Sequence, residues 1–326
     1  MNLLVTGGAG FIGSNYVRSV IEGALAGIDS ITIIDNLTYA GVQANLNDLI
    51  SHANVKFIKG DICDEEIVRN LLEGIDAIIN FAAESHVDRS IIDATSFIST
   101  NVMGVQVLLD AIRKSNRRIR FLQVSTDEVY GSIEEGSWTE DSPLLPNSPY
   151  SASKAAGELL VKAYSKTYGL DVVITRSSNN YGPFHFPEKL IPLFITNVLE
   201  NKDLPLYGSG KNIRDWLHVS DNCRAIHLVL MNGKIGEIYN IGGGSEFSNL
   251  EITHRILDQM GLDKSQIRYV PDRKGHDLRY SVNWTKIRKE LGFEPRVDLD
   301  FGLSETIKWY QENNNWWQPL KSRVDL

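Results

Sequence analysis

Residues 2 to 13 read Asn-Leu-Leu-Val-Thr-Gly-Gly-Ala-Gly-Phe-Ile-Gly, an apolar run that leads directly into closely spaced glycines. The run predicts a buried strand over residues 2–6, and the glycines predict a tight turn into a helix. Gly7, Gly10 and Gly13 would let the backbone approach a pyrophosphate, whose charge the N-terminus of the helix favours. Glycines at this spacing also occur in purely structural turns, so the assignment depends on residues further along the chain.

Acidic residues lie at or just beyond the ends of the next two predicted strands, which cover residues 30–35 and 55–59. Asp35 ends the first of them, where a carboxylate can accept hydrogen bonds from an adenosine ribose and would repel a 2′-phosphate. This position favours NAD over NADP, although an ordinary loop or capping residue is also compatible with it. Asp61 and Ile62 follow the second strand, at a position suited to the adenine. Residues 82–86 follow a further predicted strand and would run beside the nicotinamide.

The alternation of strands and helices predicts the fold class. Predicted strands over 77–81, 121–125 and 172–175 continue the pattern, with helical segments between them, so we expect a Rossmann-type doubly wound parallel sheet. After residue 176, frequent Gly and Pro predict a smaller, interleaved α+β substrate-binding domain. A helix over 219–231 and a strand over 238–241 would return to the first sheet. The expected division is an NAD-binding domain at 1–176 and about 215–245, a smaller substrate-binding domain at 177–214 and about 246–320, and a tail at 321–326.

Composition limits the possible functions. The chain of 326 residues has a net charge of −8, which gives no electrostatic footprint for DNA or RNA. Cys63 and Cys223 lie far apart without metal-ligand spacing, which favours reduced thiols in the cytoplasm, and no histidine pattern indicates a metal site. We expect no apolar stretch long enough to span a bilayer and no N-terminal targeting segment. The sequence therefore predicts a cytoplasmic enzyme without a metal.

Two motifs carry acid and base groups, Ser125-Thr-Asp-Glu-Val-Tyr-Gly131 and Tyr150-Ser-Ala-Ser-Lys154. Tyr150 and Lys154 share a helix face, so we expect the ammonium to hold the phenol pKa below its usual value of about 10. Asp127 and Glu128 add two carboxyl groups that simple alcohol oxidation does not require, which suggests a second reaction. Solvated loop carboxylates and an amphipathic helix surface are the plain alternatives for these two pairs.

These motifs resemble those of the extended short-chain dehydrogenase/reductase family, and more closely its nucleotide-sugar branch. Further resemblances are Ser177-Ser-Asn-Asn-Tyr-Gly-Pro183, His185-Phe-Pro-Glu-Lys-Leu-Ile-Pro192 and Gly210-Lys-Asn-Ile-Arg-Asp-Trp216, so that both predicted domains are covered. Epimerases of this branch usually carry small or apolar residues in place of Asp127 and Glu128. The two acids therefore distinguish this chain from the epimerases.

The resemblance implies a hydro-lyase that removes water from a nucleotide hexose. Tyr150 would accept the 4-hydroxyl proton while a hydride passes to NAD, with Lys154 lowering the phenol pKa and Thr126 hydrogen-bonding the oxygen. The carbon-4 ketone makes the carbon-5 proton removable, and Glu128 would take that proton. Asp127, in its protonated form, would donate to the departing 6-hydroxyl, and the hydride would return to carbon 6.

The resemblance also implies ligand sets, a substrate and an assembly. The cofactor set is Gly7, Gly10, Phe11, Ile12, Gly13, Asp35, Asn36, Thr38, Asp61, Ile62, Ala82, Ala83, Ser85, Thr100, Tyr150, Lys154 and Asn180. The substrate set is Ser85, His86, Thr126, Asn179, Lys189, Leu190, Pro205, Tyr207, Arg214, Asn249, Arg273 and His276. The favoured substrate is dTDP-glucose, with uridine possible as the base, and the expected assembly is a homodimer through helices around 93–114 and 149–168. A 4-epimerase, a dehydratase of another nucleotide hexose and a non-catalytic NAD sensor are the alternatives.

Overall fold

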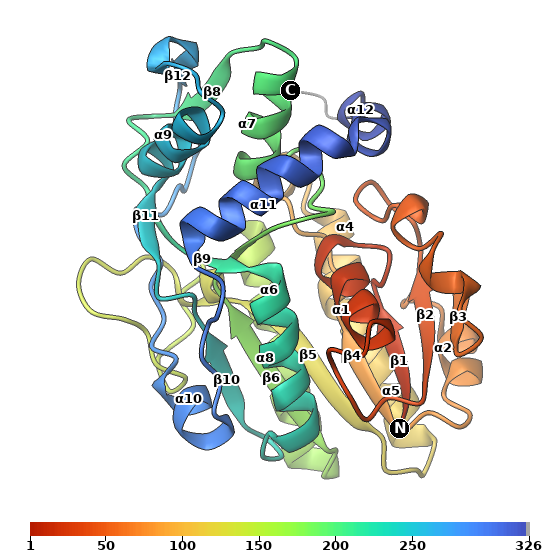
Figure 1. The fold of residues 1–326 in the computed structure, drawn as a ribbon. Coiled ribbons are helices and arrows are strands. Elements are labelled where there is room, and N and C mark those ends of the chain that lie inside the picture. Colours follow the sequence, from red (N-terminus) through yellow and green to blue (C-terminus); the bar gives the residue numbers. More distant parts are fainter. Residues whose placement is uncertain (324–326) are drawn as a thin grey trace.

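The computed structural model describes residues 1–323, and a parallel seven-stranded sheet covered by helices on both faces forms its larger part (Figure 1). The strand order is β10-β6-β5-β4-β1-β2-β3. The order reverses between β1 and β4, and such a switch point opens a crevice at the carboxyl ends of the strands. This confirms the predicted fold class. The strands are β1 (Asn2–Thr6), β2 (Ser30–Asp35), β3 (Val55–Lys59), β4 (Ala77–Asn80), β5 (Arg120–Thr126), β6 (Val172–Ser177) and β10 (Ile238–Ile241).

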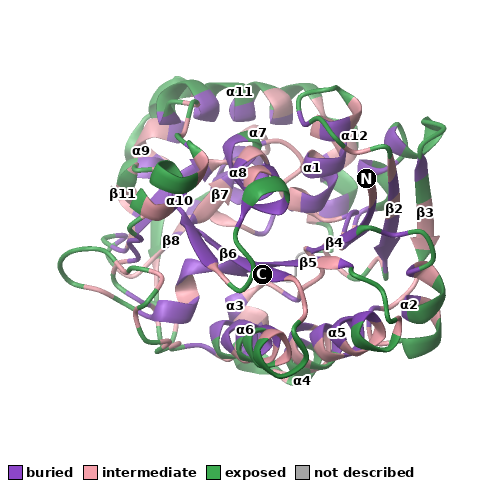
Figure 2. Ribbon diagram, turned by 90° about the horizontal axis from the view of Figure 1, so that it is seen from below, coloured by how far each residue is buried: buried purple, intermediate pink, exposed green. Residues whose placement is uncertain are grey.

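Two apolar cores lie on the two faces of this sheet. Along β1, Leu3 and Val5 point into one core and Leu4 into the other, as the alternation of side chains along a strand requires. Figure 2 shows the strands of this sheet, largely coloured as buried, between the two helix layers. The first core is covered by α1 (Phe11–Ile21), α8 (Val219–Asn232) and α10 (Thr285–Leu291), and the second by α2 (Glu65–Leu71), α5 (Val105–Lys114) and α6 (Pro149–Tyr168).

One helical run is longer and more apolar than the sequence led us to expect. α4 (Thr95–Ile98), the π-helical turn η3 (Ser99–Gly104) and α5 join into a run, Thr95–Lys114, that could cross a membrane by length and composition. The expectation that no stretch reaches this length is therefore wrong, because serine, threonine and glycine interrupt the apolar residues without ending the helix. Val105, Leu108 and Ile112 of this run pack in the second core, as they do in a core helix of a water-soluble domain.

The smaller part is built from two short sheets and the helices around them. One sheet has the order β11 (Glu246–Ser248), β9 (Ile213–His218), β7 (Asn179–Tyr181), and the other pairs β12 (Ile267–Val270) with β8 (Leu204–Tyr207). Tyr181, Trp216, Ile252 and Leu303 belong to its separate core. The surrounding helices are α7 (Leu190–Leu199), α9 (Asn249–Gln259), α11 (Leu299–Glu312) and α12 (Asn314–Lys321), and the remaining short elements are α3 (Val87–Ile92), η1 (Gln43–Asn45), η2 (Leu49–Ser51), η4 (Asp127–Tyr130) and η5 (Lys264–Gln266).

The chain passes between the two parts more than once. After β9, α8 and β10 return to the large sheet, and α10 packs Ile287 into the first core although the predicted division placed this segment in the smaller domain. The division itself stays a prediction. Of the predicted tail, Lys321 ends α12, and residues 324–326 lie outside the described residues.

Candidate active site

A cavity of about 630 Å³ lies at the carboxyl ends of the strands, between the two parts of the molecule. Residues of β2 and β5, with residues that directly follow β1 and β4, line one side of it, and residues of α7, β8 and β9 line the other. Every residue of the predicted catalytic, cofactor and substrate sets lines this one cavity. The fold thus brings together side chains that are spread from Gly7 to His276 in the sequence.

The glycine turn leaves no room for side chains. Gly7 has φ +68°, and a Cβ there would lie 2.5 Å from the backbone nitrogen of Ala82. A Cβ on Gly13 would lie 2.4 Å from the carbonyl oxygen of Gly7. Gly10 precedes α1 without a capping side chain, so the first N–H groups of that helix are not covered by a cap. The turn is therefore a cradle of the size and polarity that a pyrophosphate needs.

Two carboxylates are fixed by backbone and side-chain donors beside this cradle. Asp35 accepts hydrogen bonds from the backbone nitrogens of Ala9 at 2.9 Å and Leu37 at 2.8 Å. Asp61 accepts from the backbone nitrogen of Cys63 and from the side chain of Asn36, both at 2.8 Å. Each carboxylate oxygen has a second lone pair, so both groups can still receive a hydrogen bond from a ligand in the cavity.

Asp127 and Glu128 lie in a single turn, η4, directly after β5. The hydroxyl of Thr126 accepts a hydrogen bond from the backbone nitrogen of Glu128 and donates one to Asp127 Oδ1, both at 3.2 Å. Asp127 is buried, and its Oδ2 has no hydrogen-bond partner within residues 1–323. An unpaired buried oxygen of this kind is costly unless it binds a proton or a ligand.

The surroundings of the two acids differ in charge. Burial raises the pKa of Asp127 well above its usual value, and the nearby carboxyls of Glu128 and Asp215 raise it further. Burial also raises the pKa of Glu128, but Arg273 and Lys189 oppose this effect. Asp127 is therefore the acid that more readily keeps a proton, and Glu128 is the one whose charged form is better supported.

Tyr150 and Lys154 stand one turn apart near the start of α6, which a Ser148 capping box begins. Lys154 Nζ donates to the carbonyl oxygen of Val124 at 2.7 Å, and burial lowers the Lys154 pKa to about 8. The phenol pKa is raised well above its usual value, first by burial and then by Glu128, while the Thr126 hydroxyl lowers it. Our expectation of a depressed phenol pKa is thus wrong for this structure. The physical reason is that burial penalises the phenolate and that the ammonium is hydrogen-bonded to a backbone carbonyl.

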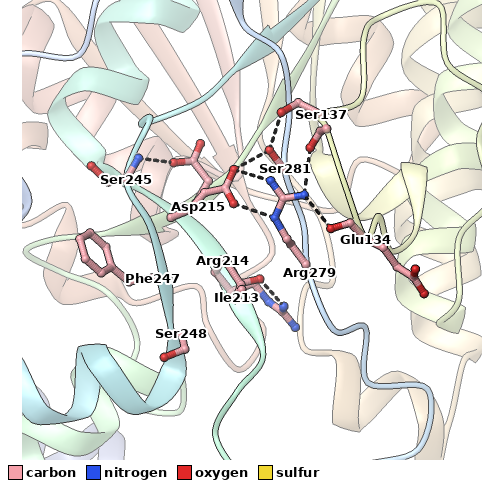
Figure 3. A network of polar contacts seen from close by, with 12 residues as sticks. Glu134, Ser137, Ile213, Arg214, Asp215, Ser245, Phe247, Ser248, Arg279 and Ser281 are labelled. Carbon is pink, nitrogen blue, oxygen red and sulfur yellow. Dashed lines mark hydrogen bonds and ion pairs between the residues drawn. The ribbon is translucent and has the colours of Figure 1, made fainter.

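The other end of the cavity carries cationic side chains. Arg214 of β9 is buried over the ring of Tyr280, with its guanidinium carbon 4.3 Å from the ring centroid. Figure 3 shows Arg214 on β9 beside Asp215, whose carboxylate accepts from the backbone nitrogen of Ser245 at 2.8 Å. Arg273 and Lys189 line the same end. Three cations from three segments of the smaller part therefore converge on the cavity.

His276 lies at this cationic end. Its Nδ1 is 2.6 Å from Asp272 Oδ1. Burial and the neighbouring Arg273 lower the His276 pKa to about 4. The imidazole is therefore neutral near pH 7 and can orient its neighbours or hydrogen-bond a ligand.

The cavity also has lining residues that the sequence did not reveal. His185 stacks on Phe11 with ring centroids 4.0 Å apart, and Tyr39 lies under the guanidinium of Arg89, which is 4.2 Å from its ring centroid. Glu84 and Glu188 add carboxyl groups. His185 and Glu188 fall inside a recognised motif, but nothing local in the sequence predicts the stacking partner of His185.

Metal binding finds no support in the described part of the chain. Within residues 1–323, no group of His, Cys, Asp and Glu side chains is arranged to hold an ion. Both cysteines are free thiols, with Cys223 buried and Cys63 partly buried. The cavity itself offers carboxyl, phenol, hydroxyl and cationic groups.

Comparisons with known proteins cover almost the whole chain. Residues 4–306 match the family described as "GDP-mannose 4,6 dehydratase". A dTDP-glucose 4,6-dehydratase of Streptomyces niveus is 56% identical over 324 residues, covering 99% of this chain and 96% of that protein. A solved dTDP-glucose 4,6-dehydratase of Streptomyces venezuelae with NAD bound is 55% identical with a TM-score of 0.97, covering 98% of this chain and 100% of that one. A UDP-glucose 4-epimerase of Thermotoga maritima is 30% identical with a TM-score of 0.88, covering 96% and 100%.

Proposed function

The chain belongs to the GDP-mannose 4,6-dehydratase family, and we propose that it converts dTDP-glucose to dTDP-4-keto-6-deoxyglucose with NAD as cofactor. It is a hydro-lyase. The identity of 55–56% to dTDP-glucose dehydratases, against 30% to an epimerase, supports this substrate and reaction. The single observation that carries the proposal is the presence of Asp127 and Glu128 in the cavity that also holds Tyr150, Lys154 and Thr126.

The cavity fits NAD. The Gly7 and Gly13 cradle accepts a pyrophosphate where any side chain would collide, and Asp35 stands where it can bind the ribose hydroxyls and reject a 2′-phosphate. The dehydratase of Streptomyces venezuelae, of the same fold, was solved with NAD bound. Bound there, NAD would supply the redox chemistry, which is acceptance of the carbon-4 hydride and its later return to carbon 6 as carbon 5 is reprotonated.

The first step places Tyr150 at the 4-hydroxyl of the hexose. Because the Tyr150 pKa is raised, the phenolate is a strong base but is rarely populated. Neighbouring groups must therefore stabilise the phenolate. The Thr126 hydroxyl does so by hydrogen bonding, while Lys154, one helical turn away, donates to the Val124 carbonyl oxygen at the floor of the site. The phenolate then accepts the hydroxyl proton as carbon 4 becomes a ketone.

The second step uses the two acids of the η4 turn. A ketone at carbon 4 makes the carbon-5 proton acidic, and Glu128, as the carboxylate, removes it. Asp127 holds its proton because it is buried beside other carboxyls, and it gives this proton to the departing 6-hydroxyl. The paired roles follow from the different surroundings of two neighbouring side chains.

The cations of the smaller part bind the diphosphate of the substrate. Guanidinium groups grip phosphate oxygens in two places, and Arg214 is held for this purpose by its contacts to backbone carbonyls of Ile213 at 2.7 Å and Asp277 at 3.0 Å. Arg273 and Lys189 supply further charge. Asn179, Leu190, Pro205, Tyr207, Asn249 and His276 would complete the nucleotide end of the site.

Product analysis on a panel of sugar nucleotides tests the function. Purified protein is incubated without added cofactor with the dTDP-, UDP-, GDP- and CDP-forms of glucose, and the products are identified by NMR. The proposal predicts a 4-keto-6-deoxy sugar from the dTDP substrate. A galactose product would identify a 4-epimerase, preference for another base would change the substrate, and no turnover of any substrate would reject the proposal.

We infer a homodimer through α4, η3, α5 and α6. Large apolar side chains are exposed on these elements, including Ile98, Met103 and Leu159, and Ile92 of α3 is 86% exposed beside them. Replacing Ile98 and Leu159 together by Asp would place charges in a buried interface, so light scattering should report a monomer for the variant and a dimer for the original protein. A dimer of unchanged stability in the variant would contradict this interface.

We infer a cytoplasmic location. The net charge of −8, the two unpaired cysteines and the likeness to a family of soluble enzymes support it. Fractionation of cells that produce the protein should recover it with the soluble proteins. Recovery in the membrane pellet would contradict the inference and would draw attention to the apolar run Thr95–Lys114.

A further inference from the structure

A fully buried ion pair lies behind the active site. Arg176 of β6 and Glu158 of α6 are 2% and 0% exposed, and the guanidinium grips the carboxylate through Nε at 3.0 Å and Nη2 at 2.6 Å to Oε2. Glu158 follows Lys154 by one turn of α6. A buried charge that loses its partner is strongly unfavourable, so these two side chains fix β6 and α6 to each other.

The pair is extended by Tyr130, the last residue of the η4 turn. The Tyr130 hydroxyl accepts a hydrogen bond from Arg176 Nη1 at 2.6 Å and donates one to Asn240 Oδ1 at 2.8 Å. Its ring is completely buried, and the Arg176 guanidinium lies over it at 4.6 Å. The end of η4 is therefore held by a charged donor and a neutral acceptor from two different strands.

Strand register explains how these groups meet. Ser125 of β5 pairs with Arg176 of β6, and Arg176 pairs with Asn240 of β10, so the three form one row across the sheet. Residues at the same level of adjacent parallel strands point to the same face, and the contact with Glu158 shows that this face is the one under α6. The row thus connects the turn that carries Asp127 and Glu128 to the helix that carries Tyr150 and Lys154.

None of Tyr130, Glu158, Arg176 and Asn240 lines the cavity, so they do not touch substrate or cofactor. We propose that Tyr130, held by Arg176 and Asn240, is a positioning residue that sets where Asp127 and Glu128 stand relative to Tyr150. It acts on the elimination of water and leaves the oxidation of carbon 4 nearly unchanged, because Tyr150 and Lys154 are placed by α6 itself. This inference rests on the proposed function.

Tyr130→Phe is the test, because it removes both hydrogen bonds and keeps the ring. In a single turnover with dTDP-glucose, we expect oxidation at close to the original rate and elimination slowed roughly ten- to a hundredfold, as misplaced catalytic groups produce. A 4-keto hexose that still carries its 6-hydroxyl should therefore accumulate. Arg176→Lys keeps a positive charge near Glu158 but loses the planar fork, and it should lower the ratio of elimination rate to oxidation rate by a smaller factor.

Tyr239→Phe is the matched control. Tyr239 is also completely buried, lies on β10 next to Asn240, and its hydroxyl also takes part in two hydrogen bonds, with the Lys234 backbone nitrogen and Glu290, both at 3.1 Å. Thermal unfolding should show a loss of stability in both variants. The ratio of elimination rate to oxidation rate should fall only in Tyr130→Phe, which a general loss of stability does not produce.

The outcomes separate this inference from the proposed function. If the original protein forms the 4-keto-6-deoxy product and Tyr130→Phe keeps the original ratio of the two rates, the positioning role is wrong and the function stands. The same holds if Tyr130→Phe slows both steps equally. If the original protein does not dehydrate dTDP-glucose, the proposed function fails first.

Discussion

Glu128→Gln is expected to stop the reaction after the oxidation of carbon 4. Glutamine has nearly the same size as glutamate but cannot accept the carbon-5 proton, and loss of a positioned base costs roughly a hundred- to ten-thousandfold in rate. Oxidation should not become slower, because the Glu128 carboxyl is one of the groups that raise the Tyr150 pKa. The variant should therefore make the ketone at least as readily as the original protein and fail to lose water from it.

A single turnover measures both steps of this variant. The absorbance of the reduced nicotinamide should rise and persist, and mass spectrometry should find a 4-keto hexose of undiminished oxygen content. Glu290→Gln is a suitable control, since Glu290 contacts Tyr239 and Lys234 and does not line the cavity. Elimination at the original rate in Glu128→Gln would show that another group removes the carbon-5 proton.

Tyr150→Phe is expected to prevent the reaction from starting. The ring should stay in place, because it is buried against Val87 and Phe97, with its centroid 6.3 Å from that of Phe97. Without the hydroxyl, no group takes the 4-hydroxyl proton, so the oxidation should slow roughly a hundred- to ten-thousandfold. No reduced nicotinamide should accumulate, and the folded stability should change little.

A double variant tests the order of the two reaction steps. If oxidation precedes elimination, the double variant of Tyr150→Phe and Glu128→Gln should behave like Tyr150→Phe alone, with no ketone and no reduced nicotinamide. Persisting nicotinamide reduction in the double variant would mean that Tyr150 is not the group that accepts the hydroxyl proton. Equal ketone formation by Tyr150→Phe and the original protein would lead to the same conclusion.

Part of the cavity lining could be predicted from the sequence because several of the motifs lie at the carboxyl end of a strand. In a parallel sheet the carboxyl ends of the strands meet at one edge, so Asp35, Asp61 and Asp127 come together although they are far apart in the chain. The strands β1, β2 and β3 begin and end at the predicted residues, since their apolar runs are bounded by polar or glycine residues.

The sequence could not give the state of Tyr150 or the support behind the turn. Helical spacing correctly placed Lys154 on the face of Tyr150, but the phenol pKa depends on how much surrounding protein excludes water, which spacing does not describe. Tyr130 lies inside a recognised motif, yet its partners Arg176 and Asn240 come from strands that follow much later. Long-range contacts of this kind carry no local signal.

The fate of the hydrogen at carbon 4 tests the central claim most directly. Purified protein is given dTDP-glucose with deuterium at carbon 4, without added cofactor, and the product is examined by NMR. A hydride that is taken from carbon 4 and returned within the same site predicts deuterium at carbon 6 of the 4-keto-6-deoxy product. Two results would contradict the account: a sugar product that keeps deuterium at carbon 4, or a 4-keto-6-deoxy product whose deuterium has been lost to the solvent.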